Sequence, residues 1–189
     1  MNKINWNGLS NLVSRSYDCG YCGNSIASQI GYWGNYFSDK EVTIYICHKC
    51  YKPTSFILGE QIPGASFGRK VSHINDQFIE MLYEEARVCC AANAYTAAVM
   101  LCRKLLMNIA IKEGAKPNLS YTAYVDYLND NNYIPPNGRG WVDAIRKMGN
   151  EANHKVEFKS DEDARLILTF TEMLLKFIYE MPGLLGGHS

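Results

Sequence analysis

Four cysteines in the first third of the chain form two matched pairs that could hold a metal ion. Each pair has the spacing Cys-x2-Cys, and 24 residues separate the pairs, which are Cys19 with Cys22 and Cys47 with Cys50. Two intervening residues allow both thiolates of a pair to face one metal from a tight turn. Two such turns complete a tetrahedral site. The spacing therefore predicts one structural zinc ion, with no coordination position left open for a catalytic water.

Two other interpretations of these cysteines compete with the metal site: four unligated thiols, or a redox pair formed by Cys19 and Cys22 in a thiol enzyme. The repeated spacing disfavours both. The chain has seven cysteines and no export signal, which argues against a disulfide framework. Gly20 and Gly23 suit a tight turn around the first pair. His48, inside the second pair, is expected to be an exposed spacer and not a ligand.

A second group of chemically capable residues lies later in the chain, where Arg146, Asn150 and His154 follow at intervals of four. On a helix, these residues fall within a sector of about 80°. His154 could transfer a proton near neutral pH, Arg146 could stabilise charge on a phosphate, and Asn150 could orient the imidazole. The alternative is a polar seam packed between helices, and the spacing alone favours that alternative.

The elements that carry these residues divide the chain into a small β part and a helical part. Short β-type runs such as Val42–Ile46 accompany the cysteines. Glycine and proline are frequent from Pro53 to Arg69, which predicts an irregular segment on the surface. We expect four parts: a zinc ribbon at 1–60, a linker at 61–71, a helical domain at 72–182 and a flexible tail at 183–189.

Apolar residues recur at helical spacing after Lys70. They predict five helices, at about 72–92, 95–113, 120–129, 140–153 and 160–182. The last helix opens on Ser160. Asp163 stands where a capping box usually has the longer Glu or Gln, so its side chain should reach the backbone N–H of Ser160 less well. The expected fold class is mainly α, an antiparallel bundle of about five helices preceded by a small β zinc ribbon.

Composition excludes several classes of protein. The chain has 19 Lys and Arg against 19 Asp and Glu, so its formal net charge is zero, and this argues against coating nucleic acid or membranes by bulk charge. Its hydrophobic fraction of 47% supports a packed core. No apolar run reaches the roughly 18 residues that span a bilayer. We expect a cytoplasmic protein that does not enter membranes.

The N-terminal segment is rich in aromatic residues, and several lie near Lys40, Lys49 and Lys52. Such residues could stack on single-stranded bases. Alternatively, a small sheet uses them as its core. Residues 1–70 have a net charge of 7 − 4 = +3, a weak basic balance that favours the core interpretation.

The order of several stretches in the second part of the chain resembles domain-of-unknown-function family 4145, of the HEPN superfamily of helical RNA-associated domains. The resemblance covers about residues 70–182 and rests on five stretches: Leu82–Arg87, Tyr95–Leu106, Ile145–His154, Asp161–Ala164 and Leu174–Tyr179. The preceding ribbon, which ends at Cys50–Thr54, also looks like an arrangement found in that family.

The resemblance implies an antiparallel helical bundle that pairs into a homodimer. Active HEPN ribonucleases carry Arg-x(4–6)-His, often with Asn after the Arg, and two copies meet at the dimer interface. They cleave RNA without metal, through attack of a ribose 2′-hydroxyl on the adjacent phosphate. Carried over, this implies His154, Arg146 and Asn150 as catalytic residues and RNA as a partner.

This sequence departs from that motif, because Gly149 stands at the position of the motif Arg. Arg146 lies about one turn earlier on the same face and could substitute. Arg139 is another possible phosphate contact. Arg103 resembles a recurrent basic position of the family, although it could instead pair with an acidic neighbour.

Two functions therefore stay open. One is an RNA-directed HEPN-like protein, a candidate metal-independent ribonuclease of a defence or toxin type. The other is a non-catalytic dimeric adaptor that binds a nucleic acid or a protein partner, for example in a defence system.

Overall fold

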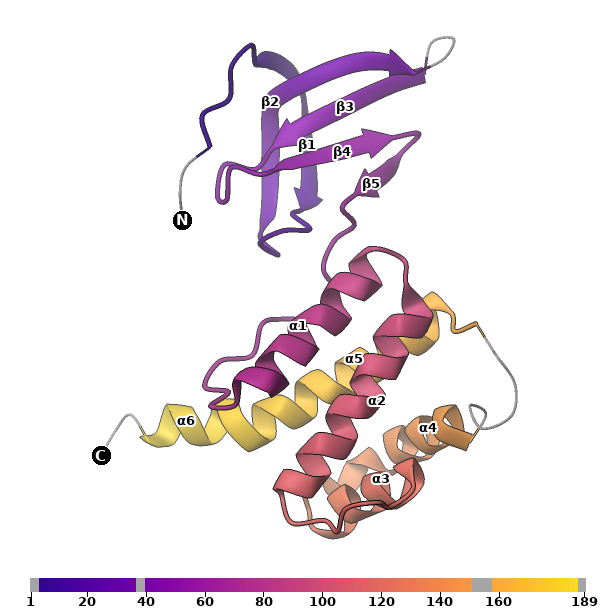
Figure 1. Cartoon of the computed structure of the whole chain (residues 1–189). Helices are drawn as coiled ribbons and strands as arrows, with labels where there is room; N and C mark the ends of the chain where they lie inside the picture. The colour runs from indigo at the N-terminus through magenta and orange to yellow at the C-terminus, as the bar shows by residue number, and fades with distance from the viewer. Residues whose placement is uncertain (1–3, 37–39, 151–157, 187–189) are drawn as a thin grey trace. The chain divides into compact units, whose positions relative to one another are not determined.

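The computed structural model in Figure 1 describes three stretches of the chain, residues 4–36, 40–150 and 158–186. The chain folds into two compact units, one of residues 1–66 with 91–93 and one of residues 67–90 with 94–189. We call them the sheet unit and the helical unit. Among the described helices, none combines the length and apolar character that crossing a membrane requires.

The sheet unit is a five-stranded antiparallel meander, in which strands adjacent in sequence are also adjacent in the sheet (Figure 1). Its strands are β1 (Ser10–Asp18), β2 (Ser25–Tyr36), β3 (Lys40–Ile46), β4 (Pro53–Ile57) and β5 (Glu60–Ile62). In the register, Gly31 of β2 lies opposite Tyr45 of β3, and Tyr45 lies opposite Thr54 of β4. Short antiparallel connections of this kind need no crossover helix.

Aromatic rings form the core of the sheet unit. Tyr17, Tyr45 and Phe56 are buried, and each ring contacts the other two at centroid distances of 5.3 to 6.1 Å. These aromatic side chains therefore form the core, as the weak basic balance favours. Trp33 is different, because 62% of its surface stays exposed on β2.

The segment after the second cysteine pair is more regular than its glycines and prolines suggest. We expected an irregular surface stretch from Pro53 to Arg69, and this is wrong for β4 and β5. Thr54 and Phe56 of β4 are buried, and the residues between and beside them are half-buried. This alternation spans only five residues. In the sequence alone, such a short pattern cannot be distinguished from a loop, and pairing with β3 is what makes the segment a strand.

The helical unit contains six α-helices within the described ranges. Their bounds are α1 (Gln77–Ala91), α2 (Tyr95–Lys112), α3 (Tyr121–Asp130), α4 (Arg139–Asn150), α5 (Asp161–Leu175) and α6 (Met181–Gly186). A short 3-10 turn, η1 (Pro136–Gly138), precedes α4, and a π-helical turn, η3 (Lys176–Glu180), joins α5 to α6. Five helices were expected, and α5, η3 and α6 together fill the span of the last.

The first helix begins five residues later than its apolar pattern indicates. Asp76 accepts hydrogen bonds through Oδ1 from the backbone N–H groups of Phe78 and Ile79, at 2.8 and 3.1 Å. These bonds satisfy two of the N–H groups that a helix start leaves unpaired. His73 has a φ of 60°, which is incompatible with a right-handed helix. The expected start at Ser72 is therefore replaced by a start at Gln77.

The start of α5 follows the predicted capping pattern. Ser160 Oγ accepts from the N–H of Asp163 at 3.2 Å, and Asp163 Oδ2 accepts from the N–H of Ser160 at 3.0 Å. Both bonds of a capping box are thus present, although Asp163 has the shorter side chain.

Helices α2 and α5 form the centre of the helical unit. Leu105 and Ile109 of α2 and Ile167 and Leu168 of α5 are fully buried. Helix α3 packs against α2, and α4 packs against α3. The core is continuous across the helices, so α4, which carries Arg146, is held in place by apolar packing.

Candidate metal centre

The first cysteine pair is held in a tight turn at the end of β1, and we call Cys19–Asn24 the first cysteine turn. The N–H of Cys19 donates to the carbonyl of Asn24 at 3.0 Å, and the N–H of Gly23 donates to the carbonyl of Cys19 at 2.8 Å. Gly23 has a φ of 67°, which glycine adopts without strain. Gly20 is needed for a different reason, because a Cβ there would lie 2.3 Å from the carbonyl oxygen of Gly64.

The second cysteine turn, Cys47–Lys52, repeats this geometry at the end of β3. The N–H of Cys47 donates to the carbonyl of Lys52 at 3.0 Å, and the N–H of Tyr51 donates to the carbonyl of Cys47 at 2.8 Å. Tyr51 takes the place of Gly23 and has a φ of 59°. Sequence reasoning found the glycines of the first turn but missed this position, because a tyrosine does not indicate positive φ.

The two turns bring four sulfur atoms together. The ligand atoms of Cys19, Cys22, Cys47 and Cys50 all lie within 4.8 Å of one another. The Sγ atoms of Cys19 and Cys50 are 3.7 Å apart, and those of Cys22 and Cys47 are 3.8 Å apart. A tetrahedral ion with metal–sulfur bonds of about 2.3 Å sets its sulfurs about 3.8 Å apart. A disulfide needs about 2.05 Å, so the geometry fits a shared metal and not a sulfur–sulfur bond.

Burial and hydrogen bonds shift the pKa values of the thiols in different directions. Cys19 and Cys47 are fully buried, and Cys50 is nearly so. Burial raises the pKa of Cys19, and it raises the pKa of Cys50 to about 12. Burial also acts on Cys22, but hydrogen bonds from Asn24 and from the thiols of Cys19 and Cys50 together outweigh it and lower the pKa of this thiol to about 7. A divalent cation would convert all four groups to thiolates, because coordination removes the proton.

The fold and this cluster define a class of two-part protein, in which a small antiparallel sheet with a candidate four-cysteine metal site precedes a helical domain. The model of the family described as domain of unknown function DUF4145 matches residues 84–185, more than half of the 189 residues. The chain belongs to this family. No curated protein matches the chain, and no solved structure matches it.

Arg146 of the second candidate site is engaged by two carboxylates. Its Nε donates to Asp126 Oδ1 of α3 at 2.6 Å, and its Nη1 donates to Asp143 Oδ1 of α4 at 3.1 Å. The hydrogen bond to Asp126 is the main cause of a raised pKa for this guanidinium. Sequence reasoning missed both partners. The spacing of Asp143 and Arg146 could have indicated the partner on the same helix, because residues three apart meet on a helix.

Of the remaining candidate residues, the structure describes the side chain of Arg103 only. His154 lies outside the described residues, and so do the side chains of Asn150 and Arg139. Arg103 of α2 lies over the ring of Tyr121 at the start of α3, with 4.6 Å from the guanidinium carbon to the ring centre. That arrangement is a cation–π contact inside the helical unit.

Proposed function

We propose that the four cysteines hold one structural zinc ion, which makes the sheet unit a zinc ribbon. The support is the pair of equivalent turns and the sulfur separations of 3.7 and 3.8 Å. Four thiolates fill a tetrahedral shell, so the ion would keep no position for water or substrate. Its role would be to stabilise a unit whose core is small.

We further propose that the chain is a non-catalytic adaptor, in which the zinc ribbon and a HEPN-like helical bundle bind a partner. One observation carries this proposal: Arg146, the residue best placed to stabilise a phosphate, is paired with Asp126 and Asp143. Two carboxylates around one guanidinium leave a local charge of about −1, which repels a phosphate. Such an arrangement suits the packing of α3 against α4 better than charge stabilisation in catalysis.

A second candidate function is cleavage of RNA without metal. It is supported by the order of Arg146 and Asn150 on α4 followed by His154, which resembles the HEPN motif, and by the exposed 34% of the Arg146 side chain. In this mechanism His154 would move the proton of the 2′-hydroxyl and Arg146 would stabilise the phosphate. Arg139 and Arg103 would be the nucleic-acid contacts.

One experiment separates the two functions. Purified full-length protein, loaded with zinc, is incubated with single-stranded and hairpin RNA, beside His154→Ala and Arg146→Ala variants. The adaptor function expects no cleavage by any of them. Arg165→Ala is the matched control, because Arg165 also pairs with an aspartate of its own helix, Asp161. Cleavage by the wild type that disappears in His154→Ala and persists in Arg165→Ala would establish the ribonuclease instead.

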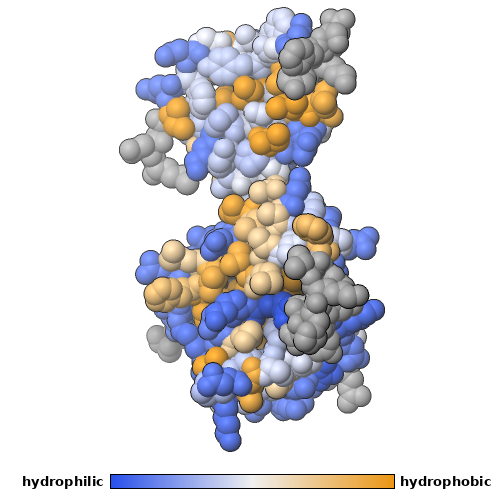
Figure 2. Space-filling view, turned by 45° about the vertical axis from the view of Figure 1, so that its right-hand side comes forward, coloured by the Kyte–Doolittle hydropathy of each residue, from blue (hydrophilic) through white to orange (hydrophobic). Residues whose placement is uncertain are grey.

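We also propose that the adaptor is a homodimer that pairs through α1. Its support is three exposed apolar side chains on the face of α1 that also holds Glu85: Phe78, Met81 and Val88 are exposed by 79%, 59% and 60%. Figure 2 shows hydrophobic surface on the helical unit beside hydrophilic side chains. Met81→Glu should give a monomer in light scattering. Met100→Glu on α2 is the matched control, since Met100 is also 59% exposed. A monomeric wild type at micromolar concentration would refute the dimer.

A further inference from the structure

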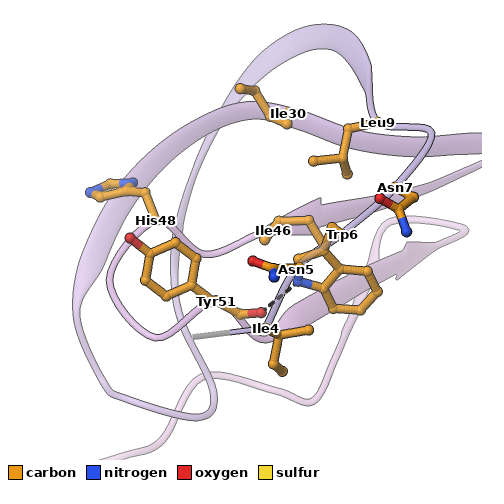
Figure 3. Close-up of a pocket in the computed structure, with 9 residues that line it drawn as sticks. All are labelled: Ile4, Asn5, Trp6, Asn7, Leu9, Ile30, Ile46, His48 and Tyr51. Carbon is orange, nitrogen blue, oxygen red and sulfur yellow. Dashed lines mark hydrogen bonds between the residues drawn. The ribbon is translucent and has the colours of Figure 1, made fainter. Parts of the chain in front are cut away.

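A pocket of about 570 Å³ opens in the sheet unit beside the second cysteine turn (Figure 3). One wall is the stretch before β1, residues 4–9, which we call the N-terminal arm. The opposite walls come from β2, the end of β3 and the second cysteine turn. The volume lies within the range of about 300–1,000 Å³ that is typical of binding pockets.

The N-terminal arm is fastened to the sheet by three contacts. Trp6 Nε1 donates to the carbonyl of Tyr51 at 2.8 Å, and the hydroxyl of Tyr32 donates to the carbonyl of Asn7. The rings of Trp6 and Tyr32 also meet edge to face, with centroids 6.2 Å apart. These contacts preform the pocket, so little conformational entropy is lost when a ligand binds.

The walls of the pocket are mainly apolar and accessible. Ile4, Leu9 and Ile30 are exposed by 43%, 38% and 44%, and they line the pocket together with the buried Ile46. The indole N–H of Trp6 already has a partner in Tyr51, so Trp6 presents its apolar ring (Figure 3). A ligand that covered these side chains would remove apolar surface from water.

The described polar part of the lining contains no Lys, Arg, Asp or Glu. It consists of the carboxamides of Asn5 and Asn7, on opposite sides of Trp6 in Figure 3, the imidazole of His48 and the phenol of Tyr51. Among the residues that the structure describes, no Lys or Arg lines the pocket, so a phosphate or carboxylate would lose its water without gaining a guanidinium or ammonium partner from them. A carboxamide offers a donor and an acceptor side by side, which matches the donor and acceptor of a peptide group.

We propose that this pocket binds one large apolar side chain of a partner protein, together with the peptide groups on either side of it. The apolar walls would take the side chain, and Asn5 and Asn7 would pair with the flanking peptide groups. The proposal rests on the adaptor function above and names the chemistry of its partner. A nucleotide fits less well, because the described lining holds no Lys or Arg to pair with its phosphate.

The test is a chemical-shift titration of the full, zinc-loaded chain, in which backbone amide signals are followed by NMR. The probes are acetyl-Gly-Leu-Gly-amide, acetyl-Gly-Phe-Gly-amide, acetyl-Gly-Asp-Gly-amide and uridine monophosphate. We expect the Leu or Phe probe to shift the signals of Asn5, Asn7 and His48 with saturation, and the Asp probe to shift none. Shifts caused by uridine monophosphate and by neither apolar probe would overturn the proposal in favour of a nucleotide site. No shift with any probe would also overturn it.

A variant pair ties the binding to the pocket. Ile30→Lys places a charge in the apolar wall and should raise the dissociation constant about tenfold or more. Val13→Lys is the control, since Val13 is 87% exposed on β1 and does not line this pocket. Zinc content and the melting temperature report whether each variant is folded. Equal binding by both folded variants would overturn the proposal, and it would leave the RNA-cleavage result, which tests the adaptor function, unchanged.

Discussion

Arg146 of α4 reaches back 20 residues in sequence to Asp126 of α3, and its Nε lies 2.6 Å from Oδ1 of that aspartate. Asp143, one turn before Arg146, contacts the same guanidinium at 3.1 Å. Arg146 is the cation of α4 that resembles a catalytic group. Its guanidinium thus connects α4 to α3. Its charge pairs α4 with α3, and this relationship is the support for the proposed adaptor function.

Asp126→Asn should weaken the helical unit slightly. The side chains of Arg146 and Asp126 are 34% and 43% exposed, so solvent screens the pair and its loss should cost about 0.5–1 kcal/mol. Asp143→Asn should cost less, because its side chain is 74% exposed. Urea denaturation of both variants measures the two costs. A larger loss from Asp143→Asn would mean that the contact within α4 dominates.

Cys47→Ser should abolish zinc binding and unfold the sheet unit, because three thiolates leave an incomplete shell around a small core. The zinc content, measured by metal analysis, should fall from about one ion per chain to none. The backbone amides of β2 and β3 should lose their protection from hydrogen exchange, and those of α2 and α5 should keep it. The control is Cys89→Ser, since Cys89 is a half-buried thiol outside the cluster. Full zinc content in Cys47→Ser would contradict the four-thiolate centre.

Arg87→Ala should be strongly destabilising. Arg87 is 8% exposed, and it donates to the carbonyls of Phe67 and Gly68 at 3.1 and 2.9 Å and to Glu84 at 2.7 Å. Its removal leaves three acceptors without their donor, at a cost of about 2–4 kcal/mol in the free energy of unfolding. Arg87→Lys should recover part of this, because an ammonium cannot reach all three. Equal losses of stability in the two variants would show that a positive charge at this position contributes nothing by itself to the free energy of unfolding.

Gly31→Ala should disrupt the sheet unit. A Cβ at Gly31 would lie 1.8 Å from the carbonyl oxygen of Ile44 in β3, so β2 and β3 would have to separate, at a cost above about 2 kcal/mol. Gly34→Ala, on the same strand, meets nothing within 4 Å and should leave stability within about 0.5 kcal/mol. Thermal unfolding of the pair measures the difference. Comparable melting temperatures would refute this packing of β2 on β3.

Glu180→Gln should remove part of the acid sensitivity of the helical unit. The carboxylate of Glu180 accepts from the N–H of Ser72 at 2.7 Å, and this bond lowers its pKa, with help from the Ser72 hydroxyl, Lys176 and His73. A lowered folded-state pKa stabilises the fold above the ordinary carboxyl pKa, near 4.3, and this contribution is lost as the pH falls through the folded-state value.

The measurement is urea denaturation at several pH values between neutral and acid. Glu180→Gln should be less stable than wild type near neutrality, and the two should converge in acid. Ser72→Ala removes the hydroxyl and keeps the backbone N–H, so its effect should be smaller. An unchanged difference between Glu180→Gln and wild type at every pH would contradict an ionised Glu180 as the source.

The features that the sequence by itself determined are local ones. The Cys-x2-Cys spacing defines both turns of the candidate metal site, because two residues set how the thiolates of a pair can point. The start of α5 at Ser160 and the end of α2 before Gly114 also follow from neighbours within one turn. Apolar periodicity located the helices for the same reason, since each needs only its own residues to show a buried face.

The tertiary structure decided what depends on residues distant in sequence. Strand β4 is a strand because β3 pairs with it, and Tyr51 takes a positive φ because the second turn must present Cys47 and Cys50 to the first. The pocket exists because the indole N–H of Trp6 donates a hydrogen bond to the carbonyl of Tyr51, 45 residues away. The charge of Arg146 meets Asp126 because α4 packs on α3, and no local spacing brings those two side chains together. Long-range packing therefore supplies a partner for this cation that its position on the helix alone could not show.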